Sequence, residues 1–463
     1  MPLALNCRHR LALFLAAVLA LAAPGLAQGS GMRPGAGEVC RPAATALPAL
    51  NACAGSDRIS LAIVGDALLH GAVQRRGYAL GFDTVWGAAA PYFRAADIAI
   101  ANLEGPTAPG FRRGGRRGAD PGPVFDDIVY SSYPLFNYHP TVIDQLRAAG
   151  VSMVTLANNH ALDRGPAGLD ATMDELDARG MPFSGTIRPG AARDFFLRVR
   201  TRMGVISLIA CTYSTNGIPD PHRQVLMCFQ NRDELLAMVG TEAARPGTGG
   251  VIVLPHWGIE YSHRPQARQR ALARDLIAAG AMAVIGTHPH VVQPFETFSG
   301  PMGHGFVAYS TGNFVSGQRR LARATGIMVW SEICRAGTGA GLALAGAGWL
   351  PLQMVVDRQG LTLTFPPHGA GGIGGQGRAL VERVIPGHDV SASVSCGPPA
   401  RASRAARSGW AAPGAGGLGG QGRALVERVI PGYDVSESVR CGRPSRASRA
   451  ARSGWEQQVP DGP

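Results

Sequence analysis

The sequence contains no lysine, and all 44 of its basic residues are arginine. The formal net charge is +12, but the excess is concentrated in residues 369–463, near the N-terminus and in the run RRGGRR at 112–117. The remainder of the chain is therefore close to neutral. A nucleic-acid-binding domain carries a basic patch on its folded surface, so this distribution does not predict a nucleic-acid partner.

The sequence also lacks a long apolar run near its N-terminus. Residues 11–23 are apolar, which is shorter than the roughly 20 residues of a membrane-spanning helix. Two arginines precede this run, and a Pro-Gly pair and small residues ending at Ala27 follow it, as in a secretory signal peptide. We predict a signal peptide over 1–27 and a periplasmic or extracellular location. The alternative is an uncleaved membrane anchor.

Cysteine is scarce, with eight residues in 463, but export permits disulfides. We consider three candidate disulfides: Cys40 with Cys53, Cys211 with Cys228, and Cys396 with Cys441. The sequence does not determine the connectivity.

The C-terminal part of the chain is a repeat. Residues 374–410 return almost unchanged as 419–455, and two copies are too few for a solenoid. Gly, Pro, Ser, Ala and Arg dominate, which predicts a largely disordered tail over 369–463 with a short strand or helical turn at RALVERVIPG in each copy. The predicted organisation is the signal peptide, an N-terminal segment 28–57, a domain 58–368 and this tail.

Strand and helix patterns alternate through the predicted domain. Apolar runs predict strands at 58–66, 97–105, 151–160, 203–214, 249–258, 281–290 and 305–314. Amphipathic spacing predicts helices at 82–97, 141–150, 168–180 and 266–280. The sequence therefore predicts an α/β fold with a substantial sheet flanked by helices.

Metal-ligating residue types recur where these apolar runs stop. They are Asp66, Asn102, Glu104, Asn158, Asn159, His160, His256, Glu260, His288, His290 and Asn313. Any one of them alone is more often structural, as a helix cap or an isolated histidine. In open α/β sheets, however, the carboxyl ends of the strands converge on one crevice, so their recurrence predicts a single polar site.

Carboxylate, amide and imidazole ligands without thiolates suit borderline divalent metals such as Mn, Fe or Zn. The sequence offers enough of them for one or two ions, as in two-metal hydrolysis of phosphate esters. His288 and His290 flank Pro289, and on an extended segment both rings would point to the same side.

The ordered motifs GDALL, ANLEGP, LANNHALDRGPAGL, HWGIEY, GTHPHVVQPFE and YSTGNF resemble those of the CapA-like poly-gamma-glutamate biosynthesis family over about 59–314. That family is similar to the calcineurin-like metallophosphoesterases, which implies a β-sandwich flanked by helices and a divalent-metal site. The resemblance implies metal ligation by Asp66, Glu104, Asn159, His256, His288 and His290 and catalytic roles for Asn159, His160, Asp163 and Glu260, the last two as supporting or substrate groups.

The first motif departs from the phosphoesterase pattern. Those enzymes carry a histidine two residues after the aspartate, where this chain has Leu68. His70 lies four residues after Asp66, so we expect one metal position to lack a ligand.

Substrate contacts are predicted for Asn102, Asn158, Arg112, Arg113 and Asn313. The two arginines belong to a long insertion, 107–140, where they either bind carboxylates and phosphates or form a solvated loop. Tyr130, Tyr133 and Tyr138 are candidate core residues that fold this insertion back.

Three functions are compatible with the sequence. The first is an exported metal-dependent hydrolase acting on an anionic envelope polymer such as poly-gamma-glutamate. The second is a non-catalytic, polymer-binding component of a capsule synthesis and export complex, with other proteins of that complex as partners. The third is a surface-binding module that acts through the basic tail. The ligand set favours the first two.

Overall fold

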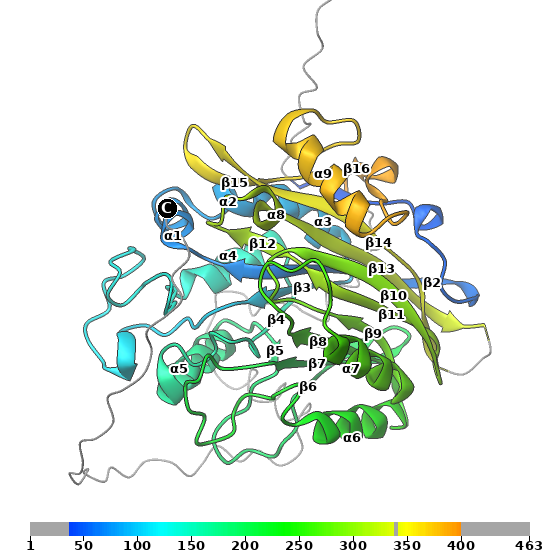
Figure 1. The fold of residues 1–463 in the computed structure, drawn as a ribbon, viewed down its shortest axis with the longest axis horizontal. Coiled ribbons are helices and arrows are strands. Elements are labelled where there is room, and N and C mark those ends of the chain that lie inside the picture. Colours follow the sequence, from blue (N-terminus) through cyan, green and yellow to red (C-terminus); the bar gives the residue numbers. More distant parts are fainter. Residues whose placement is uncertain (1–36, 338–340, 400–463) are drawn as a thin grey trace, which may run out of the picture. The chain divides into compact units, whose positions relative to one another are not determined.

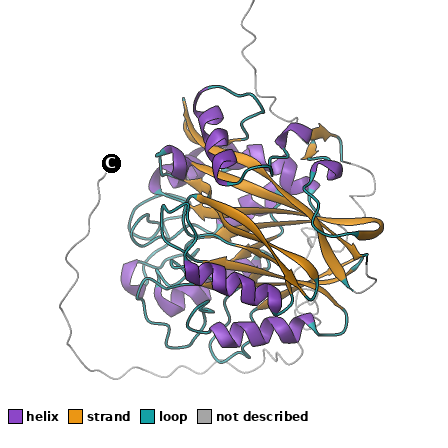
Figure 2. Ribbon diagram, turned by 45° about the vertical axis from the view of Figure 1, so that its right-hand side comes forward, coloured by secondary structure: helices purple, strands orange, loops and turns teal. Residues whose placement is uncertain are grey.

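The computed structural model describes residues 37–337 and 341–399, in which two large β-sheets lie face to face between layers of helices (Figure 1, Figure 2). The predicted α/β class, with sheets flanked by helices, is confirmed. The predicted signal peptide and residues 400–463, with the second repeat copy and Cys441, lie outside the described residues.

One sheet has eight strands. In spatial order they are β15 (Gly360–Thr364), β14 (Leu342–Asp357), β13 (Thr325–Ala336), β2 (Cys53–Leu68), β3 (Ile98–Leu103), β4 (Met153–Thr155) and β5 (Phe183–Ser184), with β12 (Asn313–Ser316) pairing with β2 off this path. Strands β2, β3, β4 and β5 run parallel, so their carboxyl ends meet at one edge.

The other sheet has six strands. Their order is β10 (Val292–Gly300), β11 (Gly303–Thr311), β9 (Ala281–Ile285), β8 (Thr248–His256), β7 (Gly204–Thr212) and β6 (Phe196–Thr201). Strands β7, β8, β9 and β11 run parallel to one another, whereas the outer strands β6 and β10 pair antiparallel with β7 and β11.

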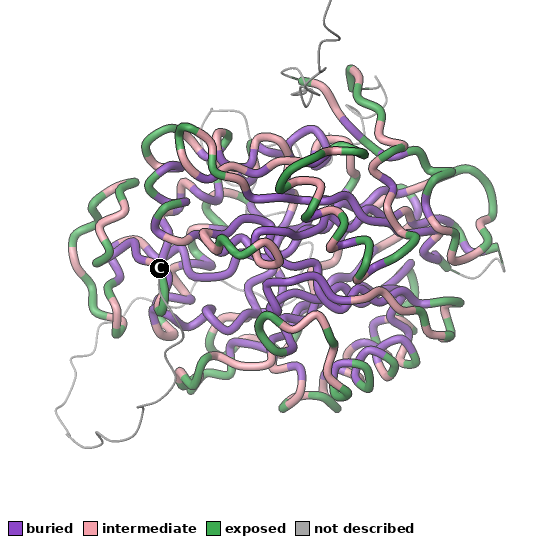
Figure 3. Tube along the Cα trace, turned by 45° about the horizontal axis from the view of Figure 1, so that its top comes forward, coloured by how far each residue is buried: buried purple, intermediate pink, exposed green. Residues whose placement is uncertain are grey.

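Alternate side chains of β8 point to opposite faces of the six-stranded sheet and belong to two hydrophobic cores. Ile252 and Leu254 face the eight-stranded sheet, while Val251 and Val253 face the helices on the outer side. Because both faces are buried, the strand is an uninterrupted apolar run, and the buried backbone in Figure 3 follows the central strands.

The helices are α1 (Gly71–Leu80), α2 (Asp83–Trp86), α3 (Ala90–Ala95), α4 (Thr141–Ala149), α5 (Gly165–Ala178), α6 (Arg232–Ala243), α7 (Ala267–Ala278), α8 (Leu321–Ala324) and α9 (Gly372–Val384). Helices α6 and α7 cover the outer face of the six-stranded sheet, and α1 to α4 lie on the eight-stranded side (Figure 1). Helix α4 ends as predicted at Gly150, whose φ of 108° is left-handed.

Several predicted elements differ from the structure. The helix predicted at 82–97 is broken into α2, a 3-10 turn (Gly87–Ala89) and α3. The strand predicted at 151–160 ends at Thr155, and the strand predicted at 281–290 ends at Ile285. In both strands the chain leaves the sheet before the polar residues, which therefore lie on loops.

The prediction of a disordered tail beginning at residue 369 is wrong for residues 369–399. Val381 of α9 and Ile385, the residue after its end, are buried, and the indole Nε1 of Trp349 in β14 donates to the Ile385 carbonyl at 3.0 Å. Of the two alternatives predicted for RALVERVIPG, a short strand or a helical turn, the first copy is helical up to Val384. The composition of this segment predicted disorder because it contains few apolar residues. A few such residues are enough to hold a helix in place when a sheet supplies the surface on which they pack.

Two of the three predicted disulfide pairings are also wrong. Cys40 bonds to Cys396, joining the short strands β1 (Val39–Arg41) and β16 (Ser395–Gly397), and Cys53 bonds to Cys334. The Cys211–Cys228 pairing is confirmed. The first two bonds close loops of 356 and 281 residues, so local spacing carried no information about them.

Candidate metal centre

The candidate ligands come from the carboxyl ends of strands in both sheets. Asp66 lies within β2, Glu104 directly follows β3, and His256 is the last residue of β8. All three are at most 1% exposed. Gly65 allows the close approach of β2 to the segment before β12, because a Cβ atom there would lie 1.8 Å from the Gly312 carbonyl oxygen.

His288 and His290 lie on a bend after β9. Their φ angles are 96° and 57°, so the segment is not extended. The expectation that an extended backbone directs both rings to the same side is therefore wrong. The rings nevertheless approach one another, with centroids 5.8 Å apart. Left-handed backbone at two non-glycine residues is strained, and such strain concentrates at functional sites.

Asp66 is at the centre of the hydrogen bonding. Its Oδ2 lies 3.1 Å from His290 Nδ1 and accepts the His288 amide at 3.3 Å. Its Oδ1 accepts from the Asn102 side-chain amide at 2.8 Å and lies 3.8 Å from His256 Nδ1. The carboxylate therefore links the two sheets.

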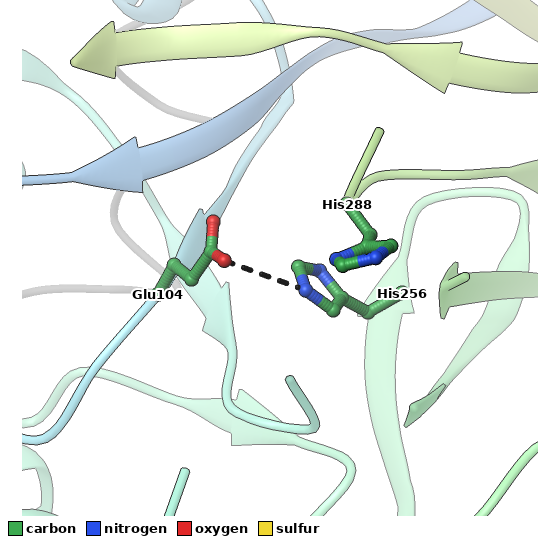
Figure 4. Close-up of side chains that lie close together, drawn as sticks. All are labelled: Glu104, His256 and His288. Atoms are coloured by element: carbon green, nitrogen blue, oxygen red, sulfur yellow. Dashed lines mark ion pairs between the residues drawn. The ribbon is translucent and has the colours of Figure 1, made fainter. Parts of the chain in front are cut away.

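Glu104 is the unusual member of the cluster. It is fully buried, yet neither of its carboxylate oxygens has a hydrogen-bond partner among the described residues. Its Oε1 lies 3.5 Å from His256 Nε2 (Figure 4). The same oxygen lies 4.0 Å from His290 Nε2. His288 Nδ1 is also buried without a described partner. Buried acceptors left open in this way fit a cation.

Three overlapping groups of side chains could hold a metal ion. Each offers ligand atoms within 4.8 Å of one another. The groups are Glu104 with His256 and His288, Asp66 with Glu104 and His290, and Glu260 with His288 and His290. Five of the six residues that the resemblance implied as ligands thus come together in these groups, which are formed by histidines and carboxylates alone. The sixth is Asn159, whose amide Oδ1 lies 2.8 Å from His256 Nε2.

The electrostatics of the cluster reflect its burial. Burial, together with the neighbouring carboxylate of Asp66, raises the pKa of Glu104 to about 8. Burial alone would lower the pKa of His290, but the carboxylates of Glu104 and Asp66 outweigh it and raise the pKa to about 9. Burial lowers the pKa of His256 to about 4. A proton on His290 thus supplies positive charge beside these carboxylates, the role that a metal cation would fill.

His160 and Asp163 form a buried pair beside this cluster. His160 Nδ1 lies 2.7 Å from Asp163 Oδ2, which also accepts the Phe136 amide at 2.6 Å. Asn159 lies on the other side, with its Oδ1 2.8 Å from His256 Nε2. The NNH motif therefore brings its asparagine and its histidine to the site together.

The predicted substrate asparagines are buried and bond to other site residues. Asn102 accepts from the Asn158 side chain at 3.2 Å and donates to Asp66, so the two amides orient the carboxylate. Asn313 Oδ1 lies 3.0 Å from His290 Nδ1. All three are at most 2% exposed, and positioning of ligands fits these contacts better than direct binding of substrate.

The insertion 107–140 contacts the site through its last residues. The Tyr138 hydroxyl donates to the Glu104 carbonyl, and the Phe136 amide donates to Asp163. Tyr130 and Tyr138 are fully buried as predicted, whereas Tyr133 is 73% exposed and is not a core residue.

Among the described residues, the hydrogen bonds and the ion pair of Arg113, a predicted substrate arginine of the insertion, lie within the insertion. Arg113 donates to the Asp127 carboxylate at 2.7 Å, and the Arg112 guanidinium packs over Gly118. Neither makes a hydrogen bond or ion pair with the metal cluster in the part of the chain that the structure describes.

His70 is close to the centre but is in none of the three ligand groups. Its Nδ1 lies 3.2 Å from the Gly317 amide and 3.1 Å from the Leu68 carbonyl. Leu68, where phosphoesterases carry a ligand histidine, is 3% exposed and belongs to the hydrophobic core. These contacts agree with the expectation that the first motif supplies one ligand.

Sequence reasoning assigned Glu260 a supporting or substrate role, and the structure brings it within reach of both histidines of the bend. It missed Thr287 and Tyr213. Thr287 Oγ1 lies 2.9 Å from His256 Nδ1, and the Tyr213 ring packs on His288 with centroids 4.3 Å apart. The position of Thr287 directly before the HPH motif was the only signal available for any of these roles.

Comparison with known proteins gives a consistent assignment. The family described as "Bacterial capsule synthesis protein PGA_cap" matches residues 60–318, more than half of the chain. "PGA biosynthesis protein CapA" of Bacillus subtilis (strain 168) is 25% identical over 289 residues, covering 61% of this chain and 70% of that protein.

"Capsule biosynthesis protein CapA" of Bacillus anthracis is 26% identical over 282 residues, covering 57% of this chain and 61% of that protein. Among solved structures, Haemophilus influenzae NAD nucleotidase (NadN) aligns at 11% identity over 76% of this chain and 60% of that chain, with a TM-score of 0.38.

Proposed function

The chain belongs to the bacterial capsule synthesis protein family PGA_cap, and we propose that it is an exported metal-dependent hydrolase of an anionic envelope polymer. The relatives named above are capsule and PGA biosynthesis proteins, which supports a poly-gamma-glutamate type of polymer as the substrate. Other capsule synthesis proteins are the expected partners.

The proposal rests on buried side chains of the metal-ligating type whose acceptor atoms have no hydrogen-bond partner among the described residues. Glu104 and His288 are buried with acceptor atoms that no described residue satisfies, and three ligand groups converge on them. Leaving a buried carboxylate unpaired is costly unless a cation compensates it. Oxygen and nitrogen ligands without sulfur fit Mn, Fe or Zn, and the overlapping groups allow one or two ions.

When bound, such a cation supplies Lewis-acid polarisation of a phosphoryl or carbonyl group. Asp66, Glu104, His256, His288 and His290 would hold it, with Glu260 available at the exposed side. His160 would carry a proton to the leaving group, because Asp163 fixes the Nδ1–H tautomer and leaves Nε2 free for proton transfer. Asn102 and Asn158 would keep the Asp66 carboxylate oriented.

Export is supported by three disulfides in the described part of the chain, since disulfides persist in oxidising compartments. No helix in residues 37–337 or 341–399 is long and apolar enough to cross a membrane. The bond that is cut is either a phosphoester or an amide, and assays with phosphoester and gamma-glutamyl substrates distinguish the two.

The test is elemental analysis of the purified chain beside the variant His288→Ala/His290→Ala. We expect near-stoichiometric Mn, Fe or Zn in the parent and its loss in the variant. The matched control is His222→Ala/His304→Ala, which removes two exposed histidines and should keep the metal. A metal-containing parent then justifies assays with phosphoester and gamma-glutamyl substrates.

A second candidate function is a non-catalytic, polymer-binding component of a capsule synthesis complex. The buried Leu68, in place of a ligand histidine, favours it because one metal position then lacks a ligand. A parent chain that folds, contains no metal and takes up none when Mn²⁺ or Zn²⁺ is supplied would select this function over hydrolysis.

A further inference from the structure

The segment between β7 and α6 forms a clamped loop beside the metal centre. Its two ends are joined by the Cys211–Cys228 disulfide, and the Thr212 amide donates to the Leu226 carbonyl at 2.9 Å. The Cys228 amide donates back to the Thr212 carbonyl at 2.7 Å. The base of the loop is therefore fixed, which makes its inner surface suitable for binding.

The inner surface of this loop encloses a hollow of about 340 Å³, within the range of ligand sites. Side chains that can bind a polar ligand line it, namely Ser214, Thr215, Asp220, Arg223, Gln230 and Asn231. We call it the loop hollow.

The loop that forms the hollow contacts the metal centre through two residues that flank the lining of the hollow. Asn216, within the same loop, accepts from the Asn159 side chain at 3.2 Å. Tyr213, at the start of the loop, packs on His288 with ring centroids 4.3 Å apart. A chain-like substrate with its reacting bond at the metal centre could therefore extend into the hollow.

The charges of the loop hollow favour a ligand with spaced single carboxylates. Arg223 makes no ion pair with any described residue, whereas the nearby Arg193 is paired with Glu234. Asp220 also lines the hollow, where its Oδ2 accepts the Val225 amide at 2.9 Å. This negative charge disfavours a densely charged polyphosphate.

Amide and hydroxyl groups complete the complementarity. Ser214, Thr215 and Asn231 each make a side-chain hydrogen bond to the backbone. Their remaining donors and acceptors, with those of Gln230, suit the amide links of a polypeptide-like chain. We propose that the loop hollow binds a segment of a gamma-linked glutamate chain, with Arg223 binding an α-carboxylate. The choice of ligand rests on the proposed function, but the binding itself requires no turnover.

The experiment is calorimetric titration of the full chain with gamma-linked tetraglutamate, in EDTA and in Mn²⁺. We expect saturable binding that Arg223→Gln weakens about tenfold, the loss of one charge-assisted hydrogen bond. Arg200→Gln is the matched control, because Arg200 is exposed on β6 and its side chain makes no described hydrogen bond or ion pair. That variant should bind like the parent.

Three results would overturn the inference: no saturable binding, equal weakening by both arginine variants, or tighter binding of tripolyphosphate than of tetraglutamate. The test is separable from that of the proposed function. Binding that depends on Arg223 in a chain without metal or turnover leaves this inference standing, whereas metal and turnover without such binding overturn this inference alone.

Discussion

His160 and Asp163 are joined by a 2.7 Å contact between Nδ1 and Oδ2, and both side chains are buried. The other oxygen of Asp163, Oδ1, is buried without a described partner. An asparagine at 163 can therefore keep its carbonyl oxygen toward His160 and the Phe136 amide while its NH₂ takes the place of Oδ1. Asp163→Asn removes the charge with little change in shape.

We expect Asp163→Asn to lower turnover at least about tenfold, because a protonated His160 loses its counter-charge. Metal content and Tm should match the parent. Steady-state kinetics with elemental analysis measures both. Asp170→Asn on α5 is the control, since Asp170 bonds only to Gln224 and should leave turnover intact. Unchanged turnover in Asp163→Asn would remove the pair from the mechanism.

The substitution Glu104→Gln tests whether the unpartnered carboxylate of Glu104 is a metal ligand. Burial makes the charged form of Glu104 unfavourable, as its pKa of about 8 indicates. The glutamine variant should be at least as stable as the metal-free parent, yet show none of the rise in Tm that Mn²⁺ produces in the parent. Thermal unfolding with and without Mn²⁺ measures this rise.

Glu332→Gln is the matched control for Glu104→Gln. Burial also raises the pKa of Glu332, but this residue lies on β13 outside the ligand groups. Its variant should keep the Mn²⁺ response. If Glu104→Gln keeps the full response as well, Glu104 is not a ligand.

The Arg198–Glu242 pair should control part of the acid sensitivity. Burial raises the pKa of Glu242, but hydrogen bonds from Arg198 and Ser207 outweigh it and lower the pKa below the ordinary 4.5. The folded state therefore holds this proton less tightly than the unfolded state. The resulting stability is complete above about pH 4.5 and is lost as pH falls through the lowered pKa.

Glu242→Gln should cost about 2 kcal/mol at pH 7 and flatten the loss of stability below pH 4.5. Urea unfolding at several pH values measures the effect. Glu234→Gln, on the same helix but with a more exposed partner pair, should cost under about 1 kcal/mol. Equal costs for the two variants would contradict the role of burial.

Helix α9 should contribute to the stability of the eight-stranded sheet. Val381→Ala removes a fully buried side chain and should cost about 2 kcal/mol in urea unfolding. Ile373→Ala, at a position 59% exposed on the same helix, should cost far less. A chain in which both variants are neutral would mean that α9 is not packed against the sheet.

Local sequence patterns predicted much of the domain. Apolar periodicity predicted strand β8 and helices α4 and α7 at the positions where the structure has them. It succeeded because the buried face of each element is set by residues close together in the sequence. The patterns failed where long-range contacts decide the structure. Helix α9 depends on Trp349, and Cys40 meets Cys396 only after the strands that carry them have paired.

The candidate site divides in the same way. The residue types that follow the strands can be read from the amino-acid order alone, and they sufficed to predict a polar site with oxygen and nitrogen ligands. Folding leaves the Glu104 carboxylate oxygens and His288 Nδ1 without hydrogen-bond partners among the described residues, while Asn102 and Asn158 support Asp66. Residue identity fixes which ligand atoms exist, whereas burial and the distances between two separate sheets fix which of them remain open to a cation.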